Sequence, residues 1–508
     1  MIALYSKAKP LACPSPFNLA DYVLTAGIHS PDKTAINIIG RTQETSLSYK
    51  ELRGSILSTA TGLLESNLKA GDKIALRLGN TIDFPIVFLA AIAVGICPVP
   101  LSSQLTAREL GPMLARLNPK AICCDPQLTL PDKTSCTIIS LSALTEFRKC
   151  SEASMVLGGP NRLAYMVFTS GTSGTPKAVM HAHRAVWARR MMIKDWYDLG
   201  SSDRMLHAGA FNWTYTLGTG LLDPWSVGAT SLIPEAGTEI SDIAALIAEH
   251  KATIFAAAPG VYRKILAAPK LPDMAHLRHG LSAGEKLAES IIEAWTTRTK
   301  TSIYEAFGMS ECSTFVSGSP NAPATRGTLG RPQDGRTLAI LEPTDKTVVA
   351  HGEIGLIAID EKDDGLMLGY YEDEASTAEK RHDTWFLTGD LGAMAADGSI
   401  TYHGRNDDVM TAGGYRISPS EVEAAFQSLT AISSLAVTQV EIKPDVFVIA
   451  AFYVSDEDIS ETLLHQVAKQ NLAHYKQPRL YVRCDALPTG PNGKLMRRAL
   501  TLPEGDRT

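Results

Sequence analysis

The segment from Thr169 to Lys177 has the composition of a loop that binds a polyphosphate. Its nine residues are Thr, Ser, Gly, Pro and a single Lys, and they follow directly on Leu163 to Phe168, an apolar run that predicts a buried strand. Gly171 and Gly174 can adopt backbone angles that turn consecutive N–H groups toward an anion. The hydroxyl groups and the Lys177 ammonium would add further donors to the same anion.

Two other interpretations of this loop are less favoured. The G-x-x-x-x-G-K-S/T spacing of a Walker A loop is absent, so the loop is not of that class. Segments rich in Gly, Ser and Thr also form flexible surface linkers. A linker seldom follows a buried strand directly and ends in Pro-Lys, so the anion-binding interpretation is preferred.

Three further segments carry residues that can bind a ligand. Residues 281–287 and 301–311 each predict a strand followed by a turn, and the second of them ends in a carboxylate. Both turns are expected outside the carboxyl ends of parallel strands, where such sheets bind ligands. The aromatic segment 207–218 predicts either core packing or a ligand wall, and its pattern does not separate the two. The pair His181 and His183 is expected to have a structural or hydrogen-bonding role, because a metal site would need a third ligand.

Composition and charge restrict the class of protein. The chain has 508 residues, a hydrophobic content of 45% and a charged content of 20%, as expected of a globular protein of about two to four domains. The net charge of −6 argues against a main role in binding nucleic acid. Eight Cys without a C-x-x-C pair indicate reduced thiols and a cytoplasmic location. No signal peptide is expected at the N-terminus, and the longest apolar run, Ile86 to Cys97, is shorter than the roughly 20 residues of a membrane span.

The elements that must position these residues alternate along the chain. Helical spacing at 49–68 and 83–95 alternates with short strand-like runs such as 97–101, and Thr106 is expected to cap a further helix. This alternation predicts an α/β fold with largely parallel sheets and helices on their faces. Beyond the loop, His181 to Asp195 predicts a helix whose N-terminus would lie near the anion.

The remainder of the chain predicts two smaller parts. From Gly327 the sequence changes to short strands with frequent Gly and Asp, which predicts a β-rich subdomain over about 327–403. It would belong to a large domain of residues 1–406. A small, mobile α+β domain is expected over 407–508, with the boundary at Asp407.

Five motifs occur in a set order along the chain. They are Thr169 to Lys177, Ser282-Ala-Gly-Glu, Phe307-Gly-Met-Ser-Glu, Thr388-Gly-Asp390 with Gly404-Arg405-Asn-Asp407-Asp, and Gly493-Lys494. Each motif by itself is weak evidence, but the ordered set is specific. On these motifs the chain resembles the adenylate-forming superfamily of acyl-CoA synthetases, nonribosomal peptide adenylation domains and firefly luciferase, over nearly its whole length.

The resemblance implies a role for each motif. The loop would hold the β- and γ-phosphates of ATP, Glu311 would bind Mg²⁺, and Asp390 would bind the ribose hydroxyls with Arg405 close by. Lys494 would bridge the substrate carboxylate and the α-phosphate, and Asp407 would be the hinge. The implied nucleotide or coenzyme A contacts are Thr169, Ser170, Gly171, Thr172, Ser173, Gly174, Thr175, Lys177, Ala283, Gly284, Glu285, Tyr304, Glu305, Ala306, Phe307, Ser310, Asp390, Arg405, Gly414 and Arg416, and the implied catalytic groups are Lys494, Glu311 and Thr172.

The chemistry that the resemblance implies is an ATP-dependent ligation in two steps. A carboxylate attacks the α-phosphate of ATP to give an acyl-AMP and pyrophosphate, and the thiol of coenzyme A then displaces AMP. Two anions meet in the first step, so positioning of the reactants and stabilisation by positive charge should contribute most to catalysis. Lys494 would supply charge in that step, and rotation of the small domain would then remove it and admit the thiol.

The acyl group is expected to be aromatic or of short to medium length. Gly308 stands where acetate-specific relatives have a Trp that closes the pocket, so acetate is disfavoured. Phe211, Trp213 and Tyr215, together with Gly284, would form the wall of the acyl pocket. The departures from the family pattern remove no catalytic group.

Two alternatives remain open at this point. A stand-alone adenylating enzyme that loads an acyl carrier protein would use the same motifs, and a non-catalytic homologue would bind the nucleotide without turnover. The expected partners are a small-molecule carboxylic acid, ATP and coenzyme A, with no nucleic acid and no transmembrane segment. A homodimer is compatible with the sequence.

Overall fold

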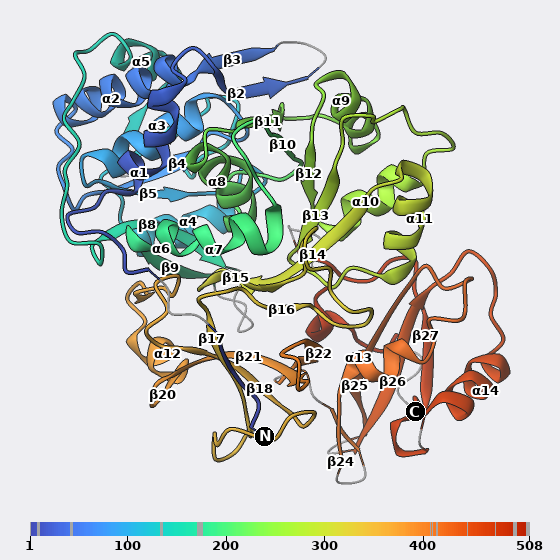
Figure 1. Ribbon diagram of the computed structural model, residues 1–508. Coiled ribbons are helices and arrows are strands. Elements are labelled where there is room, and N and C mark those ends of the chain that lie inside the picture. The colour runs from blue at the N-terminus through green and yellow to red at the C-terminus, as the bar shows by residue number, and fades with distance from the viewer. Residues whose placement is uncertain are drawn as a thin grey trace. The chain divides into compact units, whose positions relative to one another are not determined.

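The chain forms two compact units. A computed structural model describes residues 2–7, 11–40, 44–132, 136–169, 176–406, 408, 410–412, 415–443, 446–472, 474–490 and 495–503. The first unit consists of residues 5–337 and 360–384, and the second of residues 1–4, 338–359 and 385–508. Figure 1 gives the order of the elements along the chain.

The largest sheet of the first unit has nine strands in the order β16-β15-β14-β13-β12-β10-β11-β2-β3. Its central strands are parallel, and the strands at both edges are antiparallel. Helices α9, α10 and α11 cover one face with a core that includes Phe255, Tyr262 and Trp295. The strands are β2 (Thr34–Ile39), β3 (Thr45–Ser48), β10 (Arg204–His207), β11 (Thr230–Pro234), β12 (Ile254–Ala257), β13 (His279–Ala283), β14 (Ser302–Met309), β15 (Ser313–Ser317) and β16 (Arg331–Pro332), and the helices are α9 (Ile243–Glu249), α10 (Pro259–Leu266) and α11 (Glu289–Thr299).

A second sheet of this unit confirms the alternation predicted for the first part of the chain. Its four strands are parallel, in the order β5-β4-β6-β7. Helix α4 begins after Thr106, whose side chain accepts a hydrogen bond from the Glu109 N–H at 3.3 Å, as the capping pattern predicts. The elements are β4 (Lys73–Arg77), β5 (Cys97–Pro100), β6 (Ala121–Cys124), β7 (Thr137–Ile139), α1 (Leu19–Thr25), α2 (Tyr49–Glu65), α3 (Asp83–Ala93), α4 (Ala107–Leu117) and α5 (Leu141–Phe147).

Helix α3 accounts for the longest apolar run of the sequence. Every residue from Phe84 to Ala93 is buried, which is the pattern of a helix inside a large core. Within the described ranges, no helix combines the length and the apolar character that crossing a membrane would require.

The prediction of a helix from His181 onward is wrong at its start. Strand β8 (Leu163–Thr169) pairs with an antiparallel strand β9 (Lys177–Ala182), which contains His181. Strand β9 also pairs with β19 (Gly369–Tyr370) on its other edge. Pairing on both edges satisfies the backbone of this segment as a strand, which its local sequence pattern does not reveal. Helical structure begins only at α6 (Arg184–Ala188) and continues through α7 (Arg190–Met192) and a π-helix over Ile193–Tyr197.

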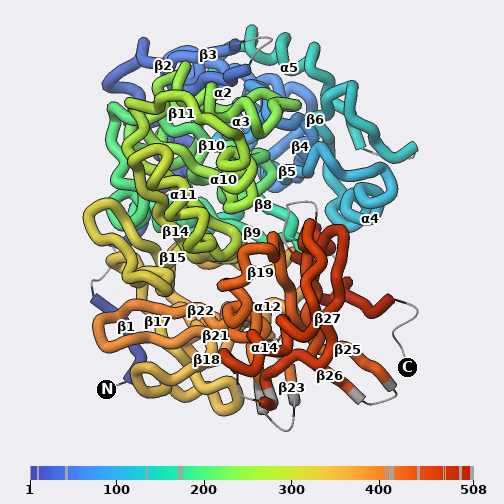
Figure 2. Tube along the Cα trace, turned by 90° about the vertical axis from the view of Figure 1, so that its right-hand side faces the viewer, coloured from blue at the N-terminus to red at the C-terminus, as the bar shows by residue number. Residues whose placement is uncertain are grey.

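The second unit contains an antiparallel sheet and a smaller α+β part. In the sheet, β18 pairs with β17, and β21 pairs with β22. In the α+β part, helices α13 and α14 pack on one face of the three-stranded sheet β25-β26-β27, whose strands lie side by side in Figure 2. The elements are β17 (Thr337–Leu341), β18 (Ile354–Asp360), β21 (Trp385–Met394), β22 (Ile400–Arg405), β23 (Met410–Ala412), β24 (Tyr415–Ile417), α13 (Pro419–Ala424), β25 (Ser434–Lys443), β26 (Val446–Val454), α14 (Glu461–Asn471) and β27 (Leu480–Arg483).

The short strands expected after Gly327 are present in this part of the chain, with one helix, α12 (Glu374–Glu379), among them. Asp407 lies outside the described residues. The domain boundary and hinge at that position therefore stay a prediction.

Candidate active site

The two ends of the predicted phosphate loop lie opposite each other. Thr169 at the end of β8 pairs with Lys177 at the start of β9. The Lys177 ammonium donates to Ser376 Oγ at 2.6 Å and lies 3.8 Å from the Asp373 carboxylate. Ser170, Gly171, Thr172, Ser173, Gly174 and Thr175 lie outside the described residues, so their roles stay predictions.

Glu311 lies on the tight turn between β14 and β15. Its side chain is 8% exposed, and the Tyr370 hydroxyl donates to Glu311 Oε1 at 2.6 Å. The Met367 N–H donates to the Glu311 carbonyl at 2.7 Å. Tyr370 therefore holds the carboxylate and Met367 holds the backbone of Glu311, and neither contact was expected from the sequence.

Two buried arginines hold the residues that follow Glu311. Arg189 forms a two-pronged ion pair with Asp223, with N–O distances of 2.8 and 2.6 Å, and also donates to the Ser313 hydroxyl. Burial opposes the charge, but Asp223 raises the pKa of the Arg189 guanidinium above its usual value. Arg336 pairs with Asp363 and donates to the Thr314 carbonyl at 3.2 Å.

The glycine at 218 explains how Arg189 reaches this position. A Cβ on Gly218 would lie 2.1 Å from Arg189 Nη2, which no side chain can tolerate. Neither arginine pair is predicted by the sequence, because no local pattern marks an arginine whose partner is 34 or 27 residues away.

Gly308 lies inside β14, where a bulge interrupts the pairing with β15, and not in the turn expected from the sequence. A Cβ at this position would lie 2.3 Å from the Ser313 carbonyl oxygen. The close approach of the two strands therefore accounts for this glycine. The surroundings of Gly308 do not show that it opens the acyl pocket past acetate, so that role stays a prediction.

The predicted adenine-side residues lie on neighbouring parallel strands. Ala283 in β13 pairs with Ala306 in β14, and Ser282 pairs with Glu305. Phe307 packs edge-on against Phe315, with ring centroids 5.3 Å apart. Gly284 and Glu285 follow directly in the bend after β13, and the Tyr304 carbonyl accepts a hydrogen bond from Trp196 at 3.0 Å.

The aromatic residues of the segment 207–218 pack in two different places. Trp213 packs against Gly284, where a Cβ would lie 2.7 Å from the indole, and edge-on against Tyr215 at 5.3 Å. Tyr215 donates to the Leu281 carbonyl at 3.2 Å. Phe211 instead stacks on Phe84 of α3 at 4.9 Å and is 1% exposed. Trp213 and Tyr215 thus lie beside the end of β13 and Phe211 lies against α3, and the wall roles of all three stay predictions.

The Glu305 carboxyl is expected to make the folding stability of the protein depend on pH. Burial raises the pKa of Glu305 to about 7, although the Leu287 N–H donates to Oε1 at 2.8 Å and favours the anion. Between about pH 4.5 and 7 the folded chain holds a proton that the unfolded chain releases, so stability falls as the pH rises. We expect Glu305→Gln, which stays neutral, to be more stable than the wild type at pH 8 by roughly 3 kcal/mol and nearly equal to it at pH 4.5.

Thermal unfolding of both proteins across this pH range tests the expectation. Glu249→Gln, at an exposed glutamate that ends α9, is the matched control and should show no such pH-dependent difference. A Glu305→Gln stabilisation of the same size at both pH values would contradict the account.

In the second unit, Asp390 and Arg405 face each other across β21 and β22. The two residues are paired in register, and Arg405 Nη1 lies 3.4 Å from Asp390 Oδ2. Asp390 is 6% exposed, and the Tyr402 hydroxyl donates to its other oxygen at 3.1 Å. Tyr402 was not expected from the sequence, although its position in the same strand as Arg405 could have indicated it.

Three predicted residues of the second unit are not described by the structure. Gly414, Asp407 and Lys494 lie outside the described ranges. Arg416 is placed only by its backbone, which pairs with that of Thr411 in the hairpin of β23 and β24. The roles of all four stay predictions.

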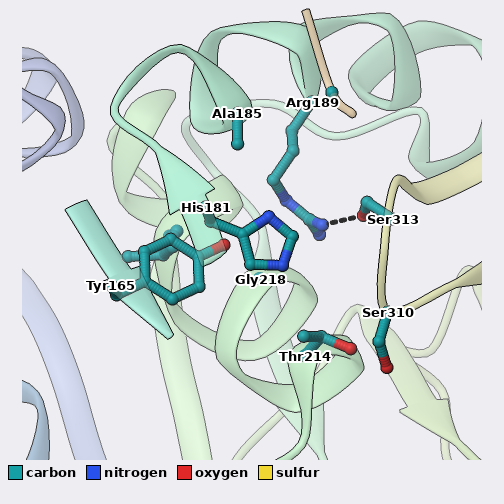
Figure 3. Close-up of a pocket in the computed structure, with 10 residues that line it drawn as sticks. Tyr165, His181, Ala185, Arg189, Thr214, Gly218, Ser310 and Ser313 are labelled. Atoms are coloured by element: carbon teal, nitrogen blue, oxygen red, sulfur yellow. Dashed lines mark hydrogen bonds between the residues drawn. The ribbon is translucent and has the colours of Figure 1, made fainter. Parts of the chain in front are cut away.

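A small cavity of about 10 Å³ lies between the aromatic segment and the Glu311 turn (Figure 3). It is lined by Thr214 and Gly218 of the segment, by Ser310 and Ser313 of the turn, and by His181 and Arg189 among others. The volume suits about one water-sized group. Ala185 and Leu222 also line the cavity, so its wall combines polar and apolar side chains.

The chain is similar to known proteins over almost its whole length. Residues 26–371 match the family described as AMP-binding enzyme. A 4-hydroxybenzoate–CoA/benzoate–CoA ligase of Rhodopseudomonas palustris is 30% identical over 489 residues, which cover 90% of this chain and 88% of that protein. The solved benzoate CoA ligase from Burkholderia xenovorans LB400 is 27% identical with a TM-score of 0.85, over 95% of this chain and 99% of that one. ATP-bound MatB from R. palustris shares the fold, with a TM-score of 0.87 and 24% identity over 95% and 98% of the two chains.

Proposed function

The chain belongs to the AMP-binding enzyme family as an AMP-forming acid–CoA ligase, and from that premise we propose that it converts an aromatic or short-to-medium-chain carboxylic acid into its acyl-CoA with ATP. The observation that carries the proposal is the presence of all five motifs in order in a chain that matches the family across residues 26–371. The two named aromatic-acid ligases among its relatives support the aromatic class. The aromatic side chains beside β13 support it as well.

Glu311 is suited to hold Mg²⁺ together with the nucleotide. Mg²⁺ usually takes one or two protein carboxylates and fills its other positions with phosphate oxygens and water. Glu311 is one such carboxylate, fixed by Tyr370, and the described residues contain no cluster of three or more His, Cys, Asp or Glu that would form an all-protein metal cage. When bound, Mg²⁺ would supply positive charge to the phosphate oxygens.

The other side chains would bind and orient the reactants. In the proposed roles, the 169–177 loop holds the phosphates that leave as pyrophosphate, and Asp390 accepts hydrogen bonds from the ribose hydroxyls. Arg405 and Tyr402 hold that carboxylate in place. The substrate carboxylate needs no base, since it is already an anion, so Lys494 acts through its charge on the α-phosphate oxygens.

A substrate panel tests this function. With ATP, Mg²⁺ and CoA, the purified protein should release pyrophosphate with at least one aromatic or C3–C12 acid and form the corresponding acyl-CoA. Binding of ATP without pyrophosphate release for any of these acids would disprove the proposal and favour a non-catalytic homologue. Pyrophosphate release without acyl-CoA formation, together with loading of an acyl carrier protein, would favour the carrier-loading alternative.

A further inference from the structure

We propose that the small cavity lined by Thr214, Gly218, Ser310, Ser313, His181 and Arg189 binds a hydroxyl group of the substrate. The proposal rests on the proposed function and narrows its substrate to hydroxylated carboxylic acids. It assigns this cavity, here called the hydroxyl subsite, a part in substrate selection.

The position of the hydroxyl subsite connects it with the reaction. Thr214 and Gly218 belong to the segment that also carries the aromatic wall residues Trp213 and Tyr215. Ser310 stands directly before Glu311 on the turn of β14 and β15. A group that extends from an acid bound along this wall would therefore be close to the cavity, whose volume of about 10 Å³ suits one hydroxyl.

His181 supplies the polar atoms that such a hydroxyl would meet. Its side chain is buried to 3% exposure and stacks on Tyr165 with ring centroids 4.8 Å apart. Neither ring nitrogen has a hydrogen bond of good geometry within the described part of the chain, although the Ser310 backbone lies close enough to favour the protonated ring. A buried polar atom without a partner costs stability, so a ligand that supplies the partner is favoured.

The chemistry of the ring matches a hydroxyl. Burial lowers the pKa of His181 to about 4, so the ring is neutral at neutral pH and has one donor and one acceptor nitrogen. A hydroxyl group both donates and accepts, and Figure 3 shows the His181 ring between Tyr165 and the Arg189 guanidinium. The hydroxyl side chains of Thr214 and Ser310 line the same space.

The charges around the subsite exclude the two charged alternatives. Arg189 is the charged residue among those found to line the cavity, and its guanidinium is balanced by Asp223 at 2.6 Å. A second substrate carboxylate would therefore be buried without an unpaired cation of its own, and an ammonium group would lie beside Arg189. A neutral hydroxyl has neither cost.

Matched substrates test the proposal on the wild-type enzyme. Pyrophosphate release is measured with benzoate, its three hydroxybenzoates and its three methylbenzoates, and with octanoate and its hydroxyoctanoates. One hydroxylated acid should exceed both its unsubstituted and its methyl-substituted analogue in kcat/KM by about 10- to 100-fold. If no hydroxylated acid exceeds its analogues while some acid is turned over, this proposal fails and the proposed function stands. No release with any acid would instead count against the proposed function.

Two variants test whether the preference for a hydroxylated acid depends on the cavity. His181→Phe keeps a ring on Tyr165 and removes both nitrogens, and Thr214→Val removes a hydroxyl at nearly constant volume. Each should reduce the ratio of kcat/KM for the preferred hydroxylated acid to that for its unsubstituted analogue, His181→Phe by at least 10-fold. The buried His183 accepts a hydrogen bond from the Leu19 N–H and does not line the cavity, so His183→Gln should leave the ratio unchanged.

A purely structural role would give a different result. Both acids would then lose activity in the same proportion, and the ratio would stay constant, which would overturn the proposal. If His181→Phe does not fold, Thr214→Val carries the test, and a ratio equal to that of the wild type in this variant would count against the subsite.

Discussion

Lys494→Ala is expected to reduce acyl-adenylate formation by a factor of about 100 to 1,000 or more, because the variant removes a cation from the α-phosphate where negative charge develops. Displacement of AMP by the thiol requires no such cation, since AMP leaves as a stable anion. Thioester formation from supplied acyl-AMP and CoA should therefore be largely retained. The two half-reactions are measured separately, the first as pyrophosphate release and the second as acyl-CoA formation.

The control for Lys494→Ala is a lysine of the same part of the chain with no proposed role. Lys469 lies exposed near the end of α14, and Lys469→Ala should leave both half-reactions near the wild-type rates. Equal losses of both half-reactions in Lys494→Ala would contradict the idea that this lysine acts in the first step alone.

Glu311→Gln is expected to lower pyrophosphate release by a factor of about 100 to 1,000, since it removes the carboxylate charge proposed to hold Mg²⁺. The amide is the same size, and its oxygen can still accept from the Tyr370 hydroxyl, which lies 2.6 Å from Oε1 in the wild type. The variant therefore keeps the position of the side chain at residue 311 and removes its negative charge. The Mg²⁺ concentration for half-maximal activity should rise, and nucleotide binding without Mg²⁺ should change little.

Tyr370→Phe separates the charge of Glu311 from its orientation. This variant leaves the carboxylate and removes one hydrogen bond to it, so activity should fall by about 10-fold or less. Glu379→Gln, at an exposed residue that ends α12, is the control for loss of a carboxylate elsewhere. If Glu311→Gln had an unchanged Mg²⁺ midpoint, the proposed role of this carboxylate would be wrong.

The sequence alone determined the features that depend on neighbouring residues. The capping pattern of Thr106 identified the start of α4, and the apolar runs identified β8 and α3. Five short motifs were sufficient to identify the family, because each consists of one or two short stretches whose residue types follow from their chemistry. The composition of the 169–177 loop is another local feature that the sequence shows by itself, although the inner residues of the loop are outside the described structure.

Local patterns were misleading where the backbone found partners from distant segments. His181 lies in a strand because β8 and β19 pair with both edges of β9, and β19 is nearly two hundred residues further along the chain. The same limit applied to Phe211, whose ring stacks on Phe84 in a helix far earlier in the sequence. Periodicity within a segment carries no information about such neighbours.

Only the tertiary structure decided what surrounds the reacting groups. It placed Arg189 between Asp223 and Ser313, put Tyr370 on Glu311, and left the buried ring of His181 beside a cavity. The sequence determined which chemical groups the protein carries, because residue type and spacing are local properties. Their partners, exposure and pKa values depend on side chains brought together by folding, and these contacts join residues that are distant along the chain.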